Sequence, residues 1–427
     1  MSVQRDIPEL LKAGIITPDT AEKIRQYYKS KDGSSSNRLF LAFGILGALL
    51  IGLGIILIIA HNWDELSTNT KTFFSFLPLV IAQIICAFVL VRKPTNKVWK
   101  ESATTFLIFA IGACNSLISQ IYHISGDLSS FLLIWLLLSL PLIYIMKSSM
   151  GALLYVMGIT YYVMELRYFS YLNSDSHYYW LLLLAVLPQY FILFKKQPKS
   201  NFLIIENWLI PLSLTIALAT VTSDSGSLIF IAYFSLFGLL YIIGNNSFFI
   251  DKSLRNNPYK VIGSIGTLIL LFMASFQGFW TDLNGEKYSF GNLITTGEFW
   301  ASLVISAGAL LYLYKQQKGR SFRELPPFSI IFLLFIPIFI LGYFSQIPVI
   351  LINLIILVLS ILTITEGARR GNLGILNFGL SIITVWIIIR FINSDLSFII
   401  RGLLLMVIGL GFFIANYLML KRRKKND

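Results

Sequence analysis

Long apolar runs separated by short polar segments occupy nearly the whole chain after residue 38. The first run, Leu39 to Ala60, carries no charge. As a helix at 1.5 Å per residue it would extend roughly 33 Å, enough to cross a hydrocarbon core of about 30 Å. We therefore predict an all-α integral membrane protein, a bundle of about 14 transmembrane helices. The predicted spans are 39–60, 72–91, 102–121, 128–146, 149–168, 178–194, 203–221, 226–243, 260–280, 298–314, 327–344, 347–365, 372–391 and 396–419.

Composition agrees with this pattern. Hydrophobic residues make up 56% of the 427, charged residues only 13%, and the mean hydropathy is +0.74. These values are typical of polytopic membrane proteins and exclude an ordinary soluble domain. The segment before the first run is polar and lacks the apolar region and small-residue cleavage site of a signal peptide. We expect the first span itself to act as the insertion signal.

Basic residues are distributed unevenly between the two sides of the predicted bundle. With a cytoplasmic N-terminus, most of the 34 Lys and Arg residues fall in inner segments, whereas the outer loops hold Lys71, Arg167 and Lys287. Such an excess in short loops is the positive-inside rule, so we predict that both termini are cytoplasmic. The net charge of +13 follows from this topology and from contact with anionic membrane lipids, and it gives no reason to expect a nucleic acid partner.

The polar segment at the N-terminus is predicted to form a cytoplasmic helical hairpin. Residues 7–12 predict a short helix, Pro18 after a Thr cap predicts the start of a second one, and residues 32–37 are typical of a flexible linker. The hairpin is either a docking element for a partner or a topogenic segment with incidental helicity. The predicted domains are the hairpin and linker at 1–38, the helix bundle at 39–420 and a basic cytoplasmic tail at 421–427.

Two polar clusters end the first and third predicted spans at the outer face. One is His61-Asn62-Trp63-Asp64, within AHNWD, and the other is SQIYHISGD at 119–127. Together with an N-terminal LLKAGIIT segment and Trp135 before LPLIY, these motifs resemble a family of uncharacterised bacterial membrane proteins, domain of unknown function 2157, over residues 7–165. The resemblance implies a multi-pass protein of the bacterial cytoplasmic membrane and no established activity.

These clusters supply the candidate outer-face site. All three histidines of the chain, His61, His123 and His177, are predicted to lie at the outer boundary, near acidic residues. Imidazoles and carboxylates could bind zinc or act as general acid and base, but the spacing matches no metal motif such as H-E-x-x-H. The residues are interfacial caps, substrate or partner contacts, or a metal or catalytic centre, and the pattern favours caps. The candidate site comprises His61, Asn62, Trp63, Asp64, Gln120, Tyr122, His123 and Asp127.

Two basic residues lie inside predicted spans. Arg390 and Arg401 flank Asp395 in the last turn at the outer face. Charged residues within spans are functional candidates, and these two would suit a lipid phosphate or carboxylate. Alternatively, each extends to the headgroups or pairs with Asp395.

Three function classes fit the sequence. A transporter or flippase-like carrier for a lipid-linked or amphipathic envelope substrate accounts for the many helices, and we favour it. No Asp or Glu lies deep in a predicted span, which argues against ion coupling. The alternatives are a non-catalytic assembly or sensor factor that contacts a partner through residues 1–38, and a membrane-embedded enzyme that uses the outer-face His and Asp residues. No nucleophile motif, nucleotide loop or metal signature is present, so an enzyme is less expected and no cofactor is predicted.

Overall fold

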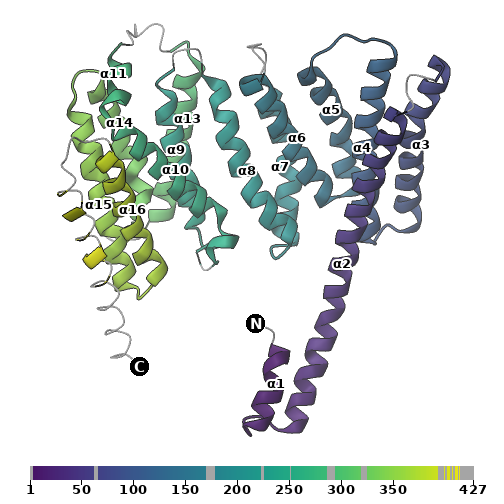
Figure 1. The fold of residues 1–427 in the computed structure, drawn as a ribbon, viewed down its shortest axis with the longest axis horizontal. Coiled ribbons are helices and arrows are strands. Elements are labelled where there is room, and N and C mark those ends of the chain that lie inside the picture. Colours follow the sequence, from purple (N-terminus) through teal and green to yellow (C-terminus); the bar gives the residue numbers. More distant parts are fainter. Residues whose placement is uncertain are drawn as a thin grey trace. The chain divides into compact units, whose positions relative to one another are not determined.

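The computed structural model describes residues 3–61, 66–169, 178–222, 226–250, 252–285, 294–318 and 325–392, with a few positions between 399 and 413. These residues form helices and turns, with no strand among them. The chain divides into two compact units, Met1–Glu206 and Asn207–Asp427, which we describe separately. Figure 1 shows the helices and their labels.

Unit 1 contains α1 to α7 and the beginning of α8. Its elements are α1 (Val3–Lys12), α2 (Pro18–His61), α3 (Thr68–Arg92), α4 (Lys97–Ile121), α5 (Leu128–Met146), α6 (Ser149–Met164), the π-helix η2 (Glu165–Phe169), α7 (Tyr178–Lys196) and α8 (Asn201–Leu218), which continues into unit 2. Polar residues cap several of these helices. The side chains of Ser67, Asn96, Asp127 and Ser148 accept the backbone N–H three residues later, which is why α3 to α6 begin where they do.

Helix α4 lies at the centre of unit 1, where it packs against α2, α3, α5 and α6. Its segment 103–108 is buried, and the indole of Trp135 on α5 donates a 2.7 Å hydrogen bond to the carbonyl of Ile108. Helix α2 approaches α4 closely at Gly44, where a Cβ would lie 2.8 Å from Oγ of Ser102 on α4. Small residues on one helix face thus allow two backbones to approach.

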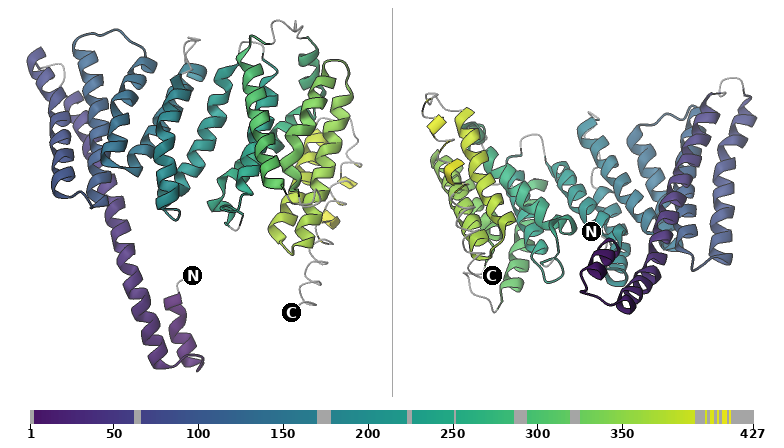
Figure 2. Two further views of the ribbon diagram at one scale, coloured as in Figure 1. Left: turned by 180° about the vertical axis from the view of Figure 1, so that it is seen from behind. Right: turned by 60° about the horizontal axis from the view of Figure 1, so that its bottom comes forward.

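The described N-terminal segment forms two helices separated by a turn at 13–17, and it differs from the prediction at the linker. Helix α1 packs on the beginning of α2, with Ile7 and Ala21 almost fully buried. The predicted linker at 32–37 is instead part of α2, which runs without a break from Pro18 to His61. Helix propagation is much easier than nucleation, so helical segments on both sides can carry weak helix formers such as Ser and Asn between them. Figure 2 shows that this part of α2, with α1 beside it, extends beyond the ends of α3 to α7.

Unit 2 is built around α9. Its elements after α8 are η3 (Ala219–Val221), α9 (Ile229–Gly244), η4 (Leu254–Asn256), α10 (Pro258–Ala274), α11 (Gln277–Gly285), α13 (Gly297–Gln317), η6 (Pro327–Ile330), α14 (Ile331–Gly342), α15 (Ile347–Arg369) and α16 (Leu373–Ile392). Helix α9 packs against α10, α13 and α14, and α15 packs against α14 and α16. The interior is aromatic, with the rings of Phe234 and Phe335 stacked 3.8 Å apart between centroids and Trp280 fully buried beside them.

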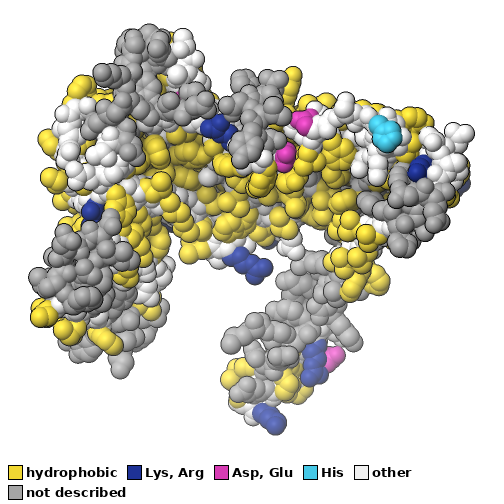
Figure 3. Space-filling view, turned by 45° about the horizontal axis from the view of Figure 1, so that its top comes forward, with side chains coloured by type: hydrophobic (Ala, Val, Ile, Leu, Met, Phe, Trp, Pro, Cys, Tyr) yellow, Lys and Arg dark blue, Asp and Glu magenta, His cyan; other side chains and the backbone are white. Residues whose placement is uncertain are grey.

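The helices agree with a membrane environment. Among the described residues, nine helices are long and apolar enough to cross a membrane, and four shorter apolar helices at 42–51, 229–244, 258–274 and 327–342 coincide with four further predicted spans. The span predicted at 396–419 lies almost entirely outside the described residues. Hydrophobic side chains cover most of the described surface in Figure 3, and charged ones are few. The protein is a helical membrane protein with several spans, while the count of 14 and the cytoplasmic termini stay predictions.

Candidate functional site

The first half of the candidate outer-face site lies at the edge of what the structure describes. His61 is the last residue of α2, and Asn62, Trp63 and Asp64 lie outside the described residues. His177 lies outside them as well. The prediction that these residues join the second polar cluster is therefore untested.

The second half of the candidate outer-face site lies where helices end or begin. His123 is exposed and has a left-handed backbone, with φ of 48°. Ile124 N–H donates to the carbonyl of Ser119 at 2.9 Å and His123 N–H to that of Gln120 at 3.4 Å, which is the Schellman arrangement that ends many helices. His adopts this conformation more readily than most residues, so the end of α4 accounts for this position.

Tyr122 connects two helices of this region. Its hydroxyl lies 3.1 Å from the hydroxyl of Thr72, which belongs to the first turns of α3. Gln120, two residues earlier on α4, is exposed. The described cluster therefore joins the end of α4 to the beginning of α3 and presents its remaining polar groups to the surroundings.

Asp127 caps α5. Its Oδ1 accepts the backbone N–H of Ser130 at 3.2 Å, and the hydroxyl of Ser129 donates to Oδ2. These hydrogen bonds favour the ionised carboxylate, first that from Ser129 and then that from Ser130, and they lower the pKa of Asp127 from 3.8 to about 2. The carboxylate is exposed, so water screens its charge.

Replacing Asp127 by Ala is expected to destabilise the protein by about 1 kcal/mol, because α5 loses its cap. The pKa of Asp127 is lower in the folded protein, so its contribution to stability is complete above about pH 4 and is lost as the pH falls towards 2. Asp127→Asn keeps an acceptor and should match the wild type at neutral pH without this pH dependence. Thermal unfolding of the three proteins across pH measures both effects; an Asn variant as unstable as the Ala variant would contradict a capping role.

The described residues give no support for a metal site. Among the described residues, no three His, Cys, Asp or Glu side chains gather as metal ligands would. Cys86 and Cys114 are both buried and free, and Cys86 donates to the carbonyl of Ala103 at 3.4 Å. The two thiols therefore act as small packing groups.

Arg390 has partners within the protein. On α16, its Nε donates to Oδ1 of Asn353 on α15 at 3.1 Å, and its Nη2 donates to the same oxygen at 2.9 Å and to the carbonyl of Ser275. The guanidinium also lies 5.5 Å from the ring centre of Phe276. These contacts join α15 and α16 to the break between α10 and α11. Arg401 and Asp395 lie outside the described residues, so the cationic spot predicted from the pair is untested.

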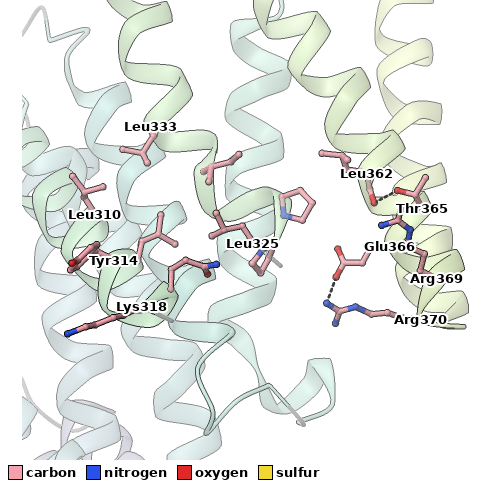
Figure 4. A pocket seen from close by; sticks show the side chains of 15 residues that line it. Leu310, Tyr314, Lys318, Leu325, Leu333, Leu362, Thr365, Glu366, Arg369 and Arg370 are labelled. Carbon is pink, nitrogen blue, oxygen red and sulfur yellow. Dashed lines mark hydrogen bonds and ion pairs between the residues drawn. The ribbon is translucent and has the colours of Figure 1, made fainter. Parts of the chain in front are cut away.

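A pocket of about 940 Å³ opens between α13, η6, α14 and α15 of unit 2. Its wall is apolar, with Leu310, Leu333 and Leu362 from three different helices. Its charged end is formed where α13 and α15 finish. Figure 4 shows Lys318 and Arg370 on opposite sides of this end, with Lys318 directed away from Arg370, and Leu333 and Leu362 above them. The described residues that line it are Leu310, Leu313, Tyr314, Gln317, Lys318, Leu325, Pro326, Pro327, Ile330, Leu333, Leu362, Thr365, Glu366, Arg369 and Arg370.

The charges of this pocket are only partly neutralised. Arg370 pairs with Glu366 at 2.9 Å, and Lys318 and Arg369 supply further positive charge at the same end. A volume of this size with mostly apolar walls and a few polar groups is typical of small-molecule sites. From the sequence, these basic residues fall in the predicted inner loops. The one available signal was that Glu366, Arg369 and Arg370 lie within a single turn at the end of an apolar helix.

Comparison with known proteins tests the family resemblance. Residues 8–163 match the model of DUF2157, a family described as "Predicted membrane protein". This stretch is a DUF2157 region. The predicted resemblance is confirmed over these residues, and it brings no activity with it. No curated protein and no solved structure matches the chain. The DUF2157 region holds the outer-face candidates from His61 to Asp127, whereas Arg390 and the pocket lie beyond it.

Proposed function

We propose that this membrane protein is a carrier for an anionic amphiphile, such as a lipid-linked envelope substrate, and that the pocket between α13 and α15 is its binding site. The observation that carries the proposal is the pocket itself, which combines apolar walls with a basic end. An acyl or polyprenyl chain would lie against Leu310, Leu333 and Leu362, and a phosphate or carboxylate would lie near Lys318 and Arg369. In the predicted topology, the basic end of the pocket lies on the cytoplasmic side.

Charge supports an anionic ligand over a neutral one. Among the described residues, three basic side chains and one acidic side chain, Glu366, line the charged end, and together they carry a positive charge. Arg binds phosphate and carboxylate oxygens in a bidentate manner, while Lys acts as a compact point charge. The apolar walls would contribute about 25 cal/mol for each Å² of ligand surface removed from water.

Binding is tested with phosphatidylglycerol and phosphatidylcholine of identical acyl chains, added to the purified protein in detergent. Phosphatidylglycerol is expected to raise the unfolding temperature and to remain bound in native mass spectrometry. Lys318→Glu with Arg369→Glu should weaken this binding at least about tenfold, a loss of 1.4 kcal/mol. The matched control is Lys195→Glu with Lys196→Glu, at the exposed end of α7 and outside the pocket lining, which should bind like the wild type.

Carrier activity needs a second measurement, because binding alone also suits a sensor. The protein is reconstituted in vesicles that contain a fluorescent phosphatidylglycerol, and an impermeant reductant reports how fast the lipid changes leaflet. We expect faster exchange with the wild type than with empty vesicles, and its loss in the pocket variant. Binding without exchange would favour the assembly or sensor function. Equal binding of both lipids, or equal loss in both charge-reversal variants, would overturn the pocket assignment.

A further inference from the structure

A buried glutamate of the DUF2157 region binds the beginning of another helix. Glu101, in the second turn of α4, is 6% exposed. Its carboxylate accepts the backbone N–H groups of Ser149 at 3.0 Å and Met150 at 2.8 Å, and the hydroxyl of Ser148. These donors form the N-terminus of α6, where the helix dipole favours a negative charge. The three hydrogen bonds and the helix dipole therefore stabilise the ionised carboxylate of Glu101.

A second buried glutamate has no such support. Glu206, in the second turn of α8 and still within unit 1, is 1% exposed. Neither of its carboxylate oxygens has a hydrogen-bond partner among the described residues. Its carboxyl group interacts electrostatically with that of Glu101. A buried carboxylate without a partner is costly, and a like charge nearby increases the cost.

We propose that Glu206 is a proton-binding site at the inner end of unit 1, with Glu101 as the charged neighbour that holds the proton there. Three hydrogen-bond donors fix the negative charge on Glu101, so the pair holds one proton, and that proton lies on Glu206. Loss of the proton leaves an unpartnered anion beside Glu101, so deprotonation favours movement of α8 or entry of water. The site lies entirely in unit 1, and its test is independent of the pocket in unit 2.

The surrounding charges agree with a negative charge on Glu101 and a proton on Glu206. Lys97, one turn before Glu101 on α4, acts electrostatically on Glu101 and also donates to Oε1 of Gln197 at 3.0 Å. From the α5–α6 turn, the groups that face Glu101 are the hydroxyl of Ser148 and two backbone N–H groups, while Lys147 is exposed. Within the described part of the chain, the charged group that acts on Glu206 is Glu101.

Carbodiimide labelling tests the site. Dicyclohexylcarbodiimide takes the proton of a carboxylic acid on one nitrogen, bonds the carboxylate oxygen at its central carbon and rearranges to a stable N-acylurea. The full-length protein in detergent is treated over a pH series, and labelled peptides are identified by mass spectrometry. We expect label on Glu206 at neutral pH, falling about tenfold for each pH unit above its midpoint. The exposed Glu22 should stay unlabelled at neutral pH.

Two variants and a second method make the result decisive. Glu206→Gln should remove the label and, in infrared spectra, the carbonyl band of a protonated carboxyl, which does not depend on access of the reagent. Glu101→Gln should move the midpoint of labelling to lower pH, because the neighbouring charge is gone. Absence of both label and band, or labelling that does not change with pH, would overturn the proposal. Protection by sodium at constant pH would overturn it in favour of a cation site.

Discussion

Gly263→Ala is expected to prevent unit 2 from forming a stable helix bundle. A Cβ at this position of α10 would lie 2.5 Å from the backbone N of Tyr241 and 2.7 Å from the carbonyl O of Phe237, both on α9. Backbone atoms cannot rotate away as a side chain can, so the two helices would have to separate. Because α9 is the helix around which the unit packs, we expect a loss of at least about 3 kcal/mol.

The matched control is Gly308→Ala on α13, where a Cβ would meet no heavy atom within 4 Å. The same substitution there should be neutral or stabilising by up to about 1 kcal/mol, since Ala is the better helix former. Size-exclusion chromatography of heated, detergent-solubilised protein gives both unfolding temperatures. Equal effects of the two substitutions would contradict the close packing of α9 and α10.

The helices were largely predictable because hydropathy determines where a chain can cross a membrane. The span predicted at 128–146 is α5 with the same limits, since Asp127 caps its beginning and Lys147, with φ of 53°, ends it. The linker prediction at 32–37 failed for a different reason. Residue composition there suggests flexibility, whereas the continuity of α2 depends on the helices on either side.

The functional candidates were less predictable, because a hydropathy pattern places a residue along a helix but not around it. Glu101 and Glu206 lie near helix ends and not deep in a span, so neither stood out from the sequence as a functional candidate. Their burial by neighbouring helices is a tertiary property. The pocket residues were missed in the same way, since α13, α14 and α15 meet there only in the folded chain.

The Arg390 site shows how such packing changes the interpretation of a charged residue. Three roles for Arg390 were open from the sequence: an anion contact, a side chain that reaches the headgroups, or a partner of Asp395. The structure gives it hydrogen bonds to Asn353 and to Ser275, between the end of α10 and the start of α11. In the sequence, Asn353 is a polar residue within an apolar run. Its oxygen accepts from Arg390 and, at 2.8 Å, from the indole of Trp386.

Asn353→Leu is therefore expected to cost about 3 kcal/mol, because, among the described residues, it leaves the guanidinium with the carbonyl of Ser275 as its remaining hydrogen-bond acceptor and the indole N–H of Trp386 unpaired. Asn353→Asp keeps the acceptor and adds an opposite charge, at the loss of the amide bonds to Val349 and Ser275, and should cost less. The unfolding temperatures of the purified variants in detergent measure the difference.

Two further variants separate this network from the general cost of altering an apolar helix. Asn377→Leu, at an exposed position of α16, should have little effect. Asn353→Leu combined with Arg390→Met removes the charge together with its acceptor, and it should be less destabilising than the sum of the two single substitutions. If Asn353→Leu proves no more harmful than Asn377→Leu, the guanidinium does not depend on Asn353, and Arg390 returns to the anion contact that the sequence allowed.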